Sequence, residues 1–195
     1  VDTYLSDEVS STTPSSNQSY STALFKTASV KSSCDLLRNL LKNPDRPAFL
    51  LCGPNGNGKS LMINSIAAEF SGYQLVTINC SAQLNSFQVL QILKQNCLVV
   101  SGIRGKEYKP KQLRLILFMK NIDLCPNDAW GTSEVIELLL QIMNRNGFYS
   151  ENLEWISISG LQICGTLMDI SKQSLSTRFL SKCNIILTNY PTESD

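Results

Sequence analysis

The sequence contains no histidine. This absence excludes a serine–histidine–aspartate triad, a metal ion held by histidine and a histidine general base. Any chemistry that the chain performs must therefore use lysine, arginine, aspartate, glutamate, asparagine, serine or threonine side chains.

An excess of charge of either sign is also lacking. The 195 residues include 17 Lys and Arg against 16 Asp and Glu, so the basic footprint of a duplex-DNA-binding protein is missing. The sequence has no run of about 18 apolar residues, and its N-terminus has no basic segment followed by an apolar one. We expect neither nucleic acid nor a membrane among the partners.

The cysteines lack the spacing of a metal site or of a disulfide framework. None forms a Cys-x-x-Cys pair, their number is odd, and several lie in apolar runs, where a free thiol behaves as a small hydrophobe. We interpret them as reduced thiols of a cytoplasmic protein. The seven are Cys34, Cys52, Cys80, Cys97, Cys125, Cys164 and Cys183.

The start of the chain differs in composition from the rest. Residues 1–22 are dominated by serine and threonine, and such a segment cannot bury a core. We predict a flexible lead-in over 1–22, followed by one folded domain over 23–195. The missing initiator methionine indicates a fragment of a longer chain.

Short apolar runs then alternate with segments of helical periodicity. This alternation predicts an α/β fold with a parallel sheet of about five strands, helices on both faces and an inserted β-hairpin. The expected strands are 48–52, 74–79, 113–119, 161–166 and 184–188, the expected hairpin is 148–159, and the expected helices are 30–42, 59–70, 87–97 and 134–145.

One segment matches the phosphate-binding pattern G-x-x-x-x-G-K-[ST] in full. It follows the predicted strand 48–52 and opens the predicted helix 59–70, which is the context that a P-loop requires. The alternative is a glycine-rich turn that merely joins a strand to a helix. The predicted nucleotide-binding residues are Gly53, Pro54, Asn55, Gly56, Asn57, Gly58, Lys59, Ser60 and Leu61.

The chemistry of phosphate explains this spacing. Successive backbone N–H groups of a glycine-rich loop can point inward around an anion, and the positive end of the following helix dipole adds attraction. Lys59 is expected to reach the β- and γ-phosphates, and the Ser60 hydroxyl is expected to ligate magnesium. The motif therefore predicts ATP or ADP with Mg²⁺.

The strand expected at 113–119 ends without the acids that hydrolysis needs. P-loop ATPases place an acidic residue there to hold magnesium, and many add a glutamate that polarises the attacking water. Here the two positions hold Lys120, which repels magnesium, and Asn121, which cannot accept a proton. Asp123 could reach the metal only if the strand end curls, and most such aspartates are turn residues. We expect hydrolysis to be slow or absent.

Arg178 lies between two apolar segments. One interpretation is an arginine finger that reaches a nucleotide held by the next subunit or module. The other is a surface arginine or a salt bridge at the edge of the core. The residues alone leave both open.

Several motifs, taken with the phosphate loop, resemble an AAA+ module of a dynein heavy chain. Their order and spacing are most similar to the third of the six modules of the dynein ring, and Lys120 with residues 151–155 favours the cytoplasmic dynein 2 branch of the family, the motor of retrograde intraflagellar transport. The motifs are Lys120-Asn121-Ile122-Asp123-Leu124, Trp130-Gly131-Thr132-Ser133, Gly147-Phe148-Tyr149, Glu151-Asn152-Leu153-Glu154-Trp155, Leu161-Gln162-Ile163, Thr177-Arg178-Phe179 and Asn189-Tyr190-Pro191.

This resemblance covers residues 24–191 and implies the large α/β part of one module, without the C-terminal helical lid. It implies that Asn121 stands at the catalytic glutamate position, that Arg178 reaches the preceding module's nucleotide, and that Met168 falls near a polar sensor position. It also implies neighbouring AAA+ modules, dynein light and intermediate chains, and microtubules (through other parts of the chain) as partners, in the cytoplasm, cytoskeleton and cilium.

Three functions compete. The leading one is a regulatory module that binds ATP or ADP within a motor. The second is an active, self-contained P-loop ATPase or kinase, which needs a magnesium-binding acid and a catalytic base near the loop. The third is a structural module with a vestigial P-loop, in which Lys59 and Ser60 have no purpose.

Overall fold

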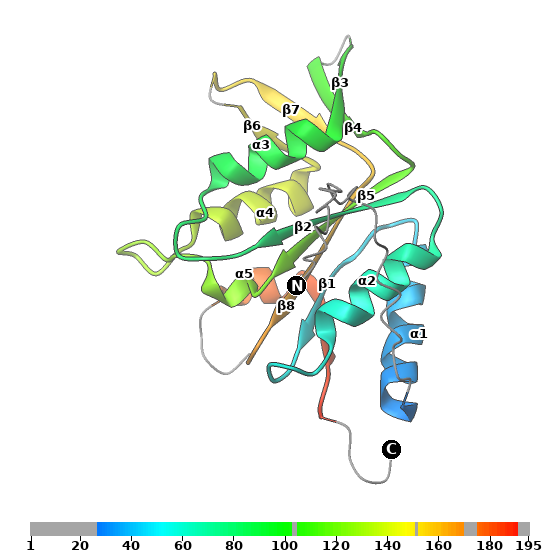
Figure 1. Ribbon diagram of the computed structural model, residues 1–195. Coiled ribbons are helices and arrows are strands. Elements are labelled where there is room, and N and C mark those ends of the chain that lie inside the picture. Colours follow the sequence, from blue (N-terminus) through cyan, green and yellow to red (C-terminus); the bar gives the residue numbers. More distant parts are fainter. Residues whose placement is uncertain (1–26, 103–104, 151, 170–174, 191–195) are drawn as a thin grey trace, which may run out of the picture.

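The structure is a computed structural model that describes residues 27–102, 105–150, 152–169 and 175–190. The predicted lead-in 1–22 lies outside the described residues, and its flexibility stays a prediction. The described chain forms two sheets, with helices packed on both sides of the larger one (Figure 1). Within these residues, no helix has the length and apolar character that a membrane crossing needs.

The larger sheet confirms the predicted parallel architecture. Its five strands run parallel in the order β2-β5-β8-β1-β9. The strand predicted at 113–119 lies one residue further along, so Lys120 is its last residue. The strands are β1 (Ala48–Cys52), β2 (Tyr73–Asn79), β5 (Arg114–Lys120), β8 (Leu161–Leu167) and β9 (Cys183–Leu187).

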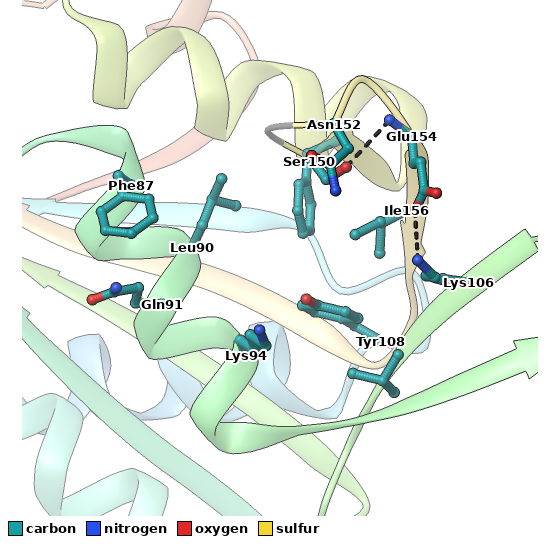
Figure 2. A pocket seen from close by; sticks show the side chains of 12 residues that line it. Phe87, Leu90, Gln91, Lys94, Lys106, Tyr108, Ser150, Asn152, Glu154 and Ile156 are labelled. Carbon is teal, nitrogen blue, oxygen red and sulfur yellow. Dashed lines mark hydrogen bonds and ion pairs between the residues drawn. The ribbon is translucent and has the colours of Figure 1, made fainter.

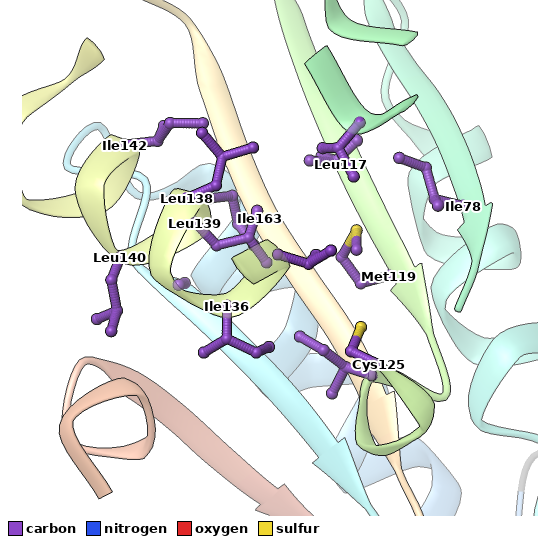
Figure 3. Packing of buried hydrophobic residues seen from close by; sticks show 14 of the residues in the cluster. Ile78, Leu117, Met119, Cys125, Ile136, Leu138, Leu139, Leu140, Ile142 and Ile163 are labelled. Atoms are coloured by element: carbon purple, nitrogen blue, oxygen red, sulfur yellow. The ribbon is translucent and has the colours of Figure 1, made fainter. Parts of the chain in front are cut away.

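Side chains of the central strands alternate between two hydrophobic cores, because successive strand residues point to opposite faces. On β5, Leu115, Leu117 and Met119 pack with α3 and α4, whereas Ile116 and Phe118 pack with α1 and α2. Figure 3 shows the first core, where α4 lies over β5 and β8. The predicted helices on both faces are confirmed: α1 (Ala28–Lys42), α2 (Lys59–Glu69), α3 (Ser86–Asn96) and α4 (Glu134–Arg145).

The smaller sheet contains the predicted hairpin and two strands that were not predicted. Its order is β3-β4-β7-β6, and the antiparallel pair β6 and β7 is the hairpin expected at 148–159. The antiparallel pair β3 and β4 was not predicted. Leu98, Val99 and Val100 of β3 are all exposed, so this strand shows no alternation of apolar and polar residues. The strands are β3 (Cys97–Gly102), β4 (Gly105–Pro110), β6 (Gly147–Tyr149) and β7 (Trp155–Ile158).

The central core yields a first prediction. Leu117 on β5 is completely buried, so Leu117→Ala leaves a cavity under α4 and is expected to lower the free energy of unfolding by about 2–5 kcal/mol. Urea denaturation measures this change. Leu113→Ala is the matched control, because Leu113 is 73% exposed and its truncation is expected to change stability by less than about 0.5 kcal/mol. Equal effects of the two substitutions would contradict this assignment of the core.

Candidate nucleotide-binding site

The phosphate loop joins β1 to α2, and its glycines adopt the conformations that the motif needs. Gly56 and Gly58 have φ values of 82° and 72°, in the left-handed region that side chains disfavour. Gly58 directly precedes α2, whose N-terminal end therefore faces the loop. At Gly53 a Cβ atom would lie 2.1 Å from the backbone oxygen of Thr188, so only glycine permits this close approach.

A cavity of ≈ 390 Å³ lies at the loop. Its walls come from the loop, the start of α2 and the carboxyl ends of β5 and β8. These ends meet there because the strands are parallel, and open α/β sheets bind ligands at this edge. The lining residues are Asn55, Gly56, Asn57, Gly58, Lys59, Ser60, Leu61, Lys120, Asn121 and Thr166. Apart from Gly53 and Pro54, every predicted nucleotide-binding residue lines the cavity.

Lys59 is buried against the loop. Its Nζ donates hydrogen bonds to the backbone oxygens of Gly53, at 2.6 Å, and Pro54, at 2.7 Å. Burial disfavours the charged ammonium and lowers the pKa of Lys59 below its ordinary value, while Cys52 and Asp123 act in the opposite direction. These two hydrogen bonds place the ammonium at the loop. Phosphate oxygens of a bound nucleotide can replace the two carbonyl oxygens as acceptors.

The strand end that lacks acids forms the facing wall. Lys120 ends β5, and Asn121 follows in a left-handed conformation with φ 56°. The backbone N–H of Asn121 donates to the hydroxyl of Thr166 on β8 at 3.0 Å, which fixes the turn. Thr166 was not predicted as a site residue, because it lies inside the apolar run of β8 with no sequence motif. Met168, the position singled out instead, does not line the cavity; its backbone oxygen accepts a hydrogen bond from the Cys52 thiol.

Asp123 lies in a short 3₁₀ turn, η1 (Ile122–Leu124), that begins where Asn121 reverses the chain. The strand end does curl, as an approach of Asp123 to the site requires, but Asp123 does not line the cavity. Its Oδ1 atom is buried and has no hydrogen-bond partner among the described residues. Asp123 as a metal ligand stays a prediction.

The lining residues do not fit a magnesium ion held by the protein. Magnesium takes about six oxygen ligands and is usually bound by one or two carboxylates besides phosphates and water. The described lining offers the hydroxyl of Ser60, the predicted ligand, but no carboxylate, and it carries the ammonium groups of Lys59 and Lys120. No group of three or more acidic or cysteine side chains suited to a metal occurs elsewhere in the described chain.

Arg178 lies at the surface on α5 (Thr177–Leu180), a short helix that was not predicted. Its side chain is 71% exposed, and it forms an ion pair with Glu137 of α4 at 3.4 Å. An exposed pair of this kind contributes little stability. The side chain can therefore exchange Glu137 for another anion, and its role as an arginine finger stays a prediction.

The segment after β9 contacts the end of β1 and the phosphate loop, and neither contact was predicted. The backbone N–H and the hydroxyl of Thr188 both donate to the backbone oxygen of Cys52, at 2.7 and 3.1 Å. The hydroxyl of Tyr190 donates to the backbone oxygen of Asn55 at 2.7 Å. Asn189-Tyr190-Pro191 resembles a motif of the family, but nothing in its residue types indicates contact with the loop; Pro191 lies outside the described residues.

A larger cavity of ≈ 500 Å³ lies between α3 and the smaller sheet (Figure 2). Its wall is mainly apolar, with Leu90, Tyr108 and Ile156, and an ion pair between Lys106 and Glu154 lies beside it. Among the described residues its lining includes no glycine, so it lacks the glycine-rich loop that phosphate binding needs. We therefore assign nucleotide binding to the smaller cavity at the phosphate loop.

Comparison with known proteins supports this assignment. The sequence matches the family described as "P-loop containing dynein motor region" over residues 12–191. Cytoplasmic dynein 2 heavy chain 1 of Rattus norvegicus is 34% identical over 176 residues, which cover 88% of this chain and 4% of that relative. The Homo sapiens protein of the same name is 34% identical over 86% of this chain, again 4% of the relative. The Chlamydomonas reinhardtii protein is 34% identical over 75% of this chain and 4% of its own length. The chain therefore belongs to the P-loop containing dynein motor regions and is an AAA module of a dynein heavy chain.

Proposed function

We propose that this module binds ATP or ADP and retains it without hydrolysis, as a regulatory site of a dynein motor. The observation that carries the proposal is the pairing of two features in one cavity. The phosphate loop is complete, with Lys59 and Ser60 in place, whereas the facing strand end presents Lys120 and Asn121.

Binding and hydrolysis make different demands on the site. Binding requires backbone donors and cations around the phosphates, and the loop, the helix N-terminus and Lys59 supply these. Hydrolysis requires in addition an oriented water and stabilisation of the charge that moves to the leaving group. Asn121 can orient a water molecule but cannot take its proton, so the chemical step lacks its base.

The two competing functions fit less well. A self-contained ATPase or kinase needs a magnesium-binding acid and a base, and the described lining of the cavity has no carboxylate. A structural module with a vestigial loop has no use for a lysine whose ammonium is buried against the loop. Its two hydrogen-bond acceptors are neutral backbone oxygens, and burying an ammonium without an anionic partner is unfavourable, so its retention favours an anionic ligand.

Regulation requires that nucleotide occupancy affect other parts of the chain, and two contacts suit that role. Tyr190 links the loop to the chain beyond β9, in the direction where the resemblance places a helical lid. Arg178 is exposed and loosely paired with Glu137, so it is available to a nucleotide in the preceding module. Each would let one module respond to nucleotide in another.

The wider role follows from the relatives, of which this chain spans 4%. We propose that the module is the third of the ring in a heavy chain of the cytoplasmic dynein 2 type, which moves cargo along microtubules in retrograde intraflagellar transport. Its partners would be neighbouring modules of the same chain, light and intermediate chains, and microtubules through other parts of the chain. Its location would be the cytoplasm, the cytoskeleton and the cilium. Magnesium at Ser60 stays a prediction of the motif alone.

Lys59→Ala tests nucleotide binding. Removing the ammonium is expected to weaken ADP and ATP binding by about 2 kcal/mol or more, roughly thirtyfold in Kd, because a charge-assisted contact to phosphate is lost. Calorimetric titration measures the affinity. Lys94→Ala is the control, since it removes the same charge from an exposed position of α3 and is expected to leave the affinity unchanged.

The same samples distinguish the three functions through phosphate release. Binding that depends on Lys59, with no turnover of ATP, is the expected result. Steady turnover would sink the regulatory proposal in favour of an active ATPase, with Asp123 or a residue of another module in place of the missing acids. Absence of binding by the unaltered chain would favour the structural module.

Tyr190→Phe tests the link between the loop and the segment after β9. Losing the hydroxyl leaves the Asn55 oxygen without its donor and is expected to weaken ADP binding about three- to tenfold, equivalent to one ordinary hydrogen bond. Tyr149→Phe is the control, because Tyr149 is a tyrosine of similar exposure in the smaller sheet. Unchanged affinity in Tyr190→Phe would show that this contact does not position the loop.

A further inference from the structure

The nucleotide cavity contains more positive charge than a phosphate loop alone provides. Lys59 and Lys120 both line it, and the described lining includes no acidic side chain. Among the described residues, no ion pair or hydrogen bond satisfies the ammonium of Lys120, although this side chain is partly buried. Two like charges in one cavity repel each other, so an anion that touches both is the natural complement.

We propose that the ammonium of Lys120 supplies the countercharge that magnesium supplies in other P-loop proteins, so that this module binds ADP or ATP without a divalent cation. The proposal rests on the proposed nucleotide-binding function and specifies the ionic form of the ligand. The phosphate chain lies between Lys59 from the loop and Lys120 from the facing strand end.

The backbone of Lys120 is held in place by both neighbouring strands. Lys120 is the last residue of β5, paired in register with Asn79 of β2, and its backbone oxygen accepts a hydrogen bond from Cys80 at 2.9 Å. On its other side, Asn121 is tied to Thr166 of β8. The backbone is thus held from both neighbouring strands, while the flexible four-carbon side chain can adjust its point charge to a phosphate oxygen.

Asp123 is the group that would support the opposite arrangement. Its Oδ1 is buried without a hydrogen-bond partner among the described residues, a state that a bound cation could relieve. Asp123 acts electrostatically on Lys59 but does not line the cavity, and the charged side chain of this strand end that does line it is Lys120. The two arrangements predict different effects of metal removal on ADP affinity. Affinity falls if Asp123 holds a magnesium ion, and it is unchanged if Lys120 supplies the countercharge.

The experiment compares ADP binding by the 195-residue chain in excess EDTA and in excess magnesium, by calorimetry. The unaltered chain is expected to bind with Kd values within about threefold of each other. Lys120→Ala is expected to weaken binding in EDTA by at least about tenfold. Lys120→Asp, which restores an acid at this position, is expected to bind poorly in EDTA and to recover at least about tenfold when magnesium is added.

Control variants separate this effect from a general change of charge or loss of folding. Lys94→Ala removes one positive charge outside the cavity and is expected to bind as the unaltered chain does in both solutions. Asp123→Asn is expected to keep the same metal-independent binding. Thermal unfolding checks each variant, and Lys120→Gln, which keeps a long polar side chain, replaces Lys120→Ala if the latter does not fold.

The possible outcomes are distinct. An affinity of the unaltered chain that falls more than about thirtyfold in EDTA, or a Lys120→Ala variant that still binds normally in EDTA, would overturn the proposal. Loss of a magnesium effect in Asp123→Asn would assign the metal to Asp123 instead. If the unaltered chain binds no ADP in either solution, the proposed nucleotide-binding function is wrong, and so is the proposed role of Lys120.

Discussion

The pairing of β8 with strands on both of its sides sets the distance across the nucleotide site. β8 lies between β1, which leads into the phosphate loop, and β5, which ends in Lys120. Gly165 suits this close pairing, because a Cβ there would lie 3.0 Å from a methyl group of Leu50 and 3.1 Å from the backbone oxygen of Met119, so these neighbours would have to shift slightly.

β8 is also anchored near each end by a polar side chain. The amide of Gln162, which is fully buried, donates to the backbone oxygens of Leu40 and Pro47, both at 3.0 Å. Towards the other end, Thr166 accepts a hydrogen bond from Asn121. Hydrogen bonds of buried groups are expensive to break, so the strand is held in register and the two walls of the cavity keep their separation.

The sequence allowed the larger sheet and the phosphate loop to be predicted for local reasons. A run such as Ala48–Cys52 is apolar throughout because both faces of the sheet are covered, and the loop has a fixed pattern of residue types. The lack of acidic residues at positions 120 and 121 was also predictable, because it depends only on which residue types follow the apolar run of β5.

The parts that could not be predicted depend on contacts between distant segments. The Tyr190 hydroxyl meets the backbone of Asn55, 135 positions earlier in the chain, and no local pattern announces such a pair. Thr166 resembles its apolar neighbours in burial, and only its hydrogen bond to Asn121 at the end of β5 shows that it lies at the site. β3 was missed because its residues are mostly exposed, so the period that identifies a strand is absent.

A site that binds nucleotide without hydrolysing it has no chemical step to empty it, so exchange alone sets its occupancy. Exchange at this site requires that Lys59 alternate between phosphate and the backbone oxygens of Gly53 and Pro54, which it contacts in this structure. The segment after β9 contacts the same region, because Thr188 donates hydrogen bonds to Cys52, which directly precedes the loop, and the Tyr190 hydroxyl donates to Asn55. Because coupling between two sites is reciprocal, a shift of the segment after β9 that changes nucleotide affinity must itself be driven by nucleotide binding. The proposed regulatory role therefore needs no catalysis in this module. It needs only a phosphate loop whose conformation depends both on bound nucleotide and on the segment after β9.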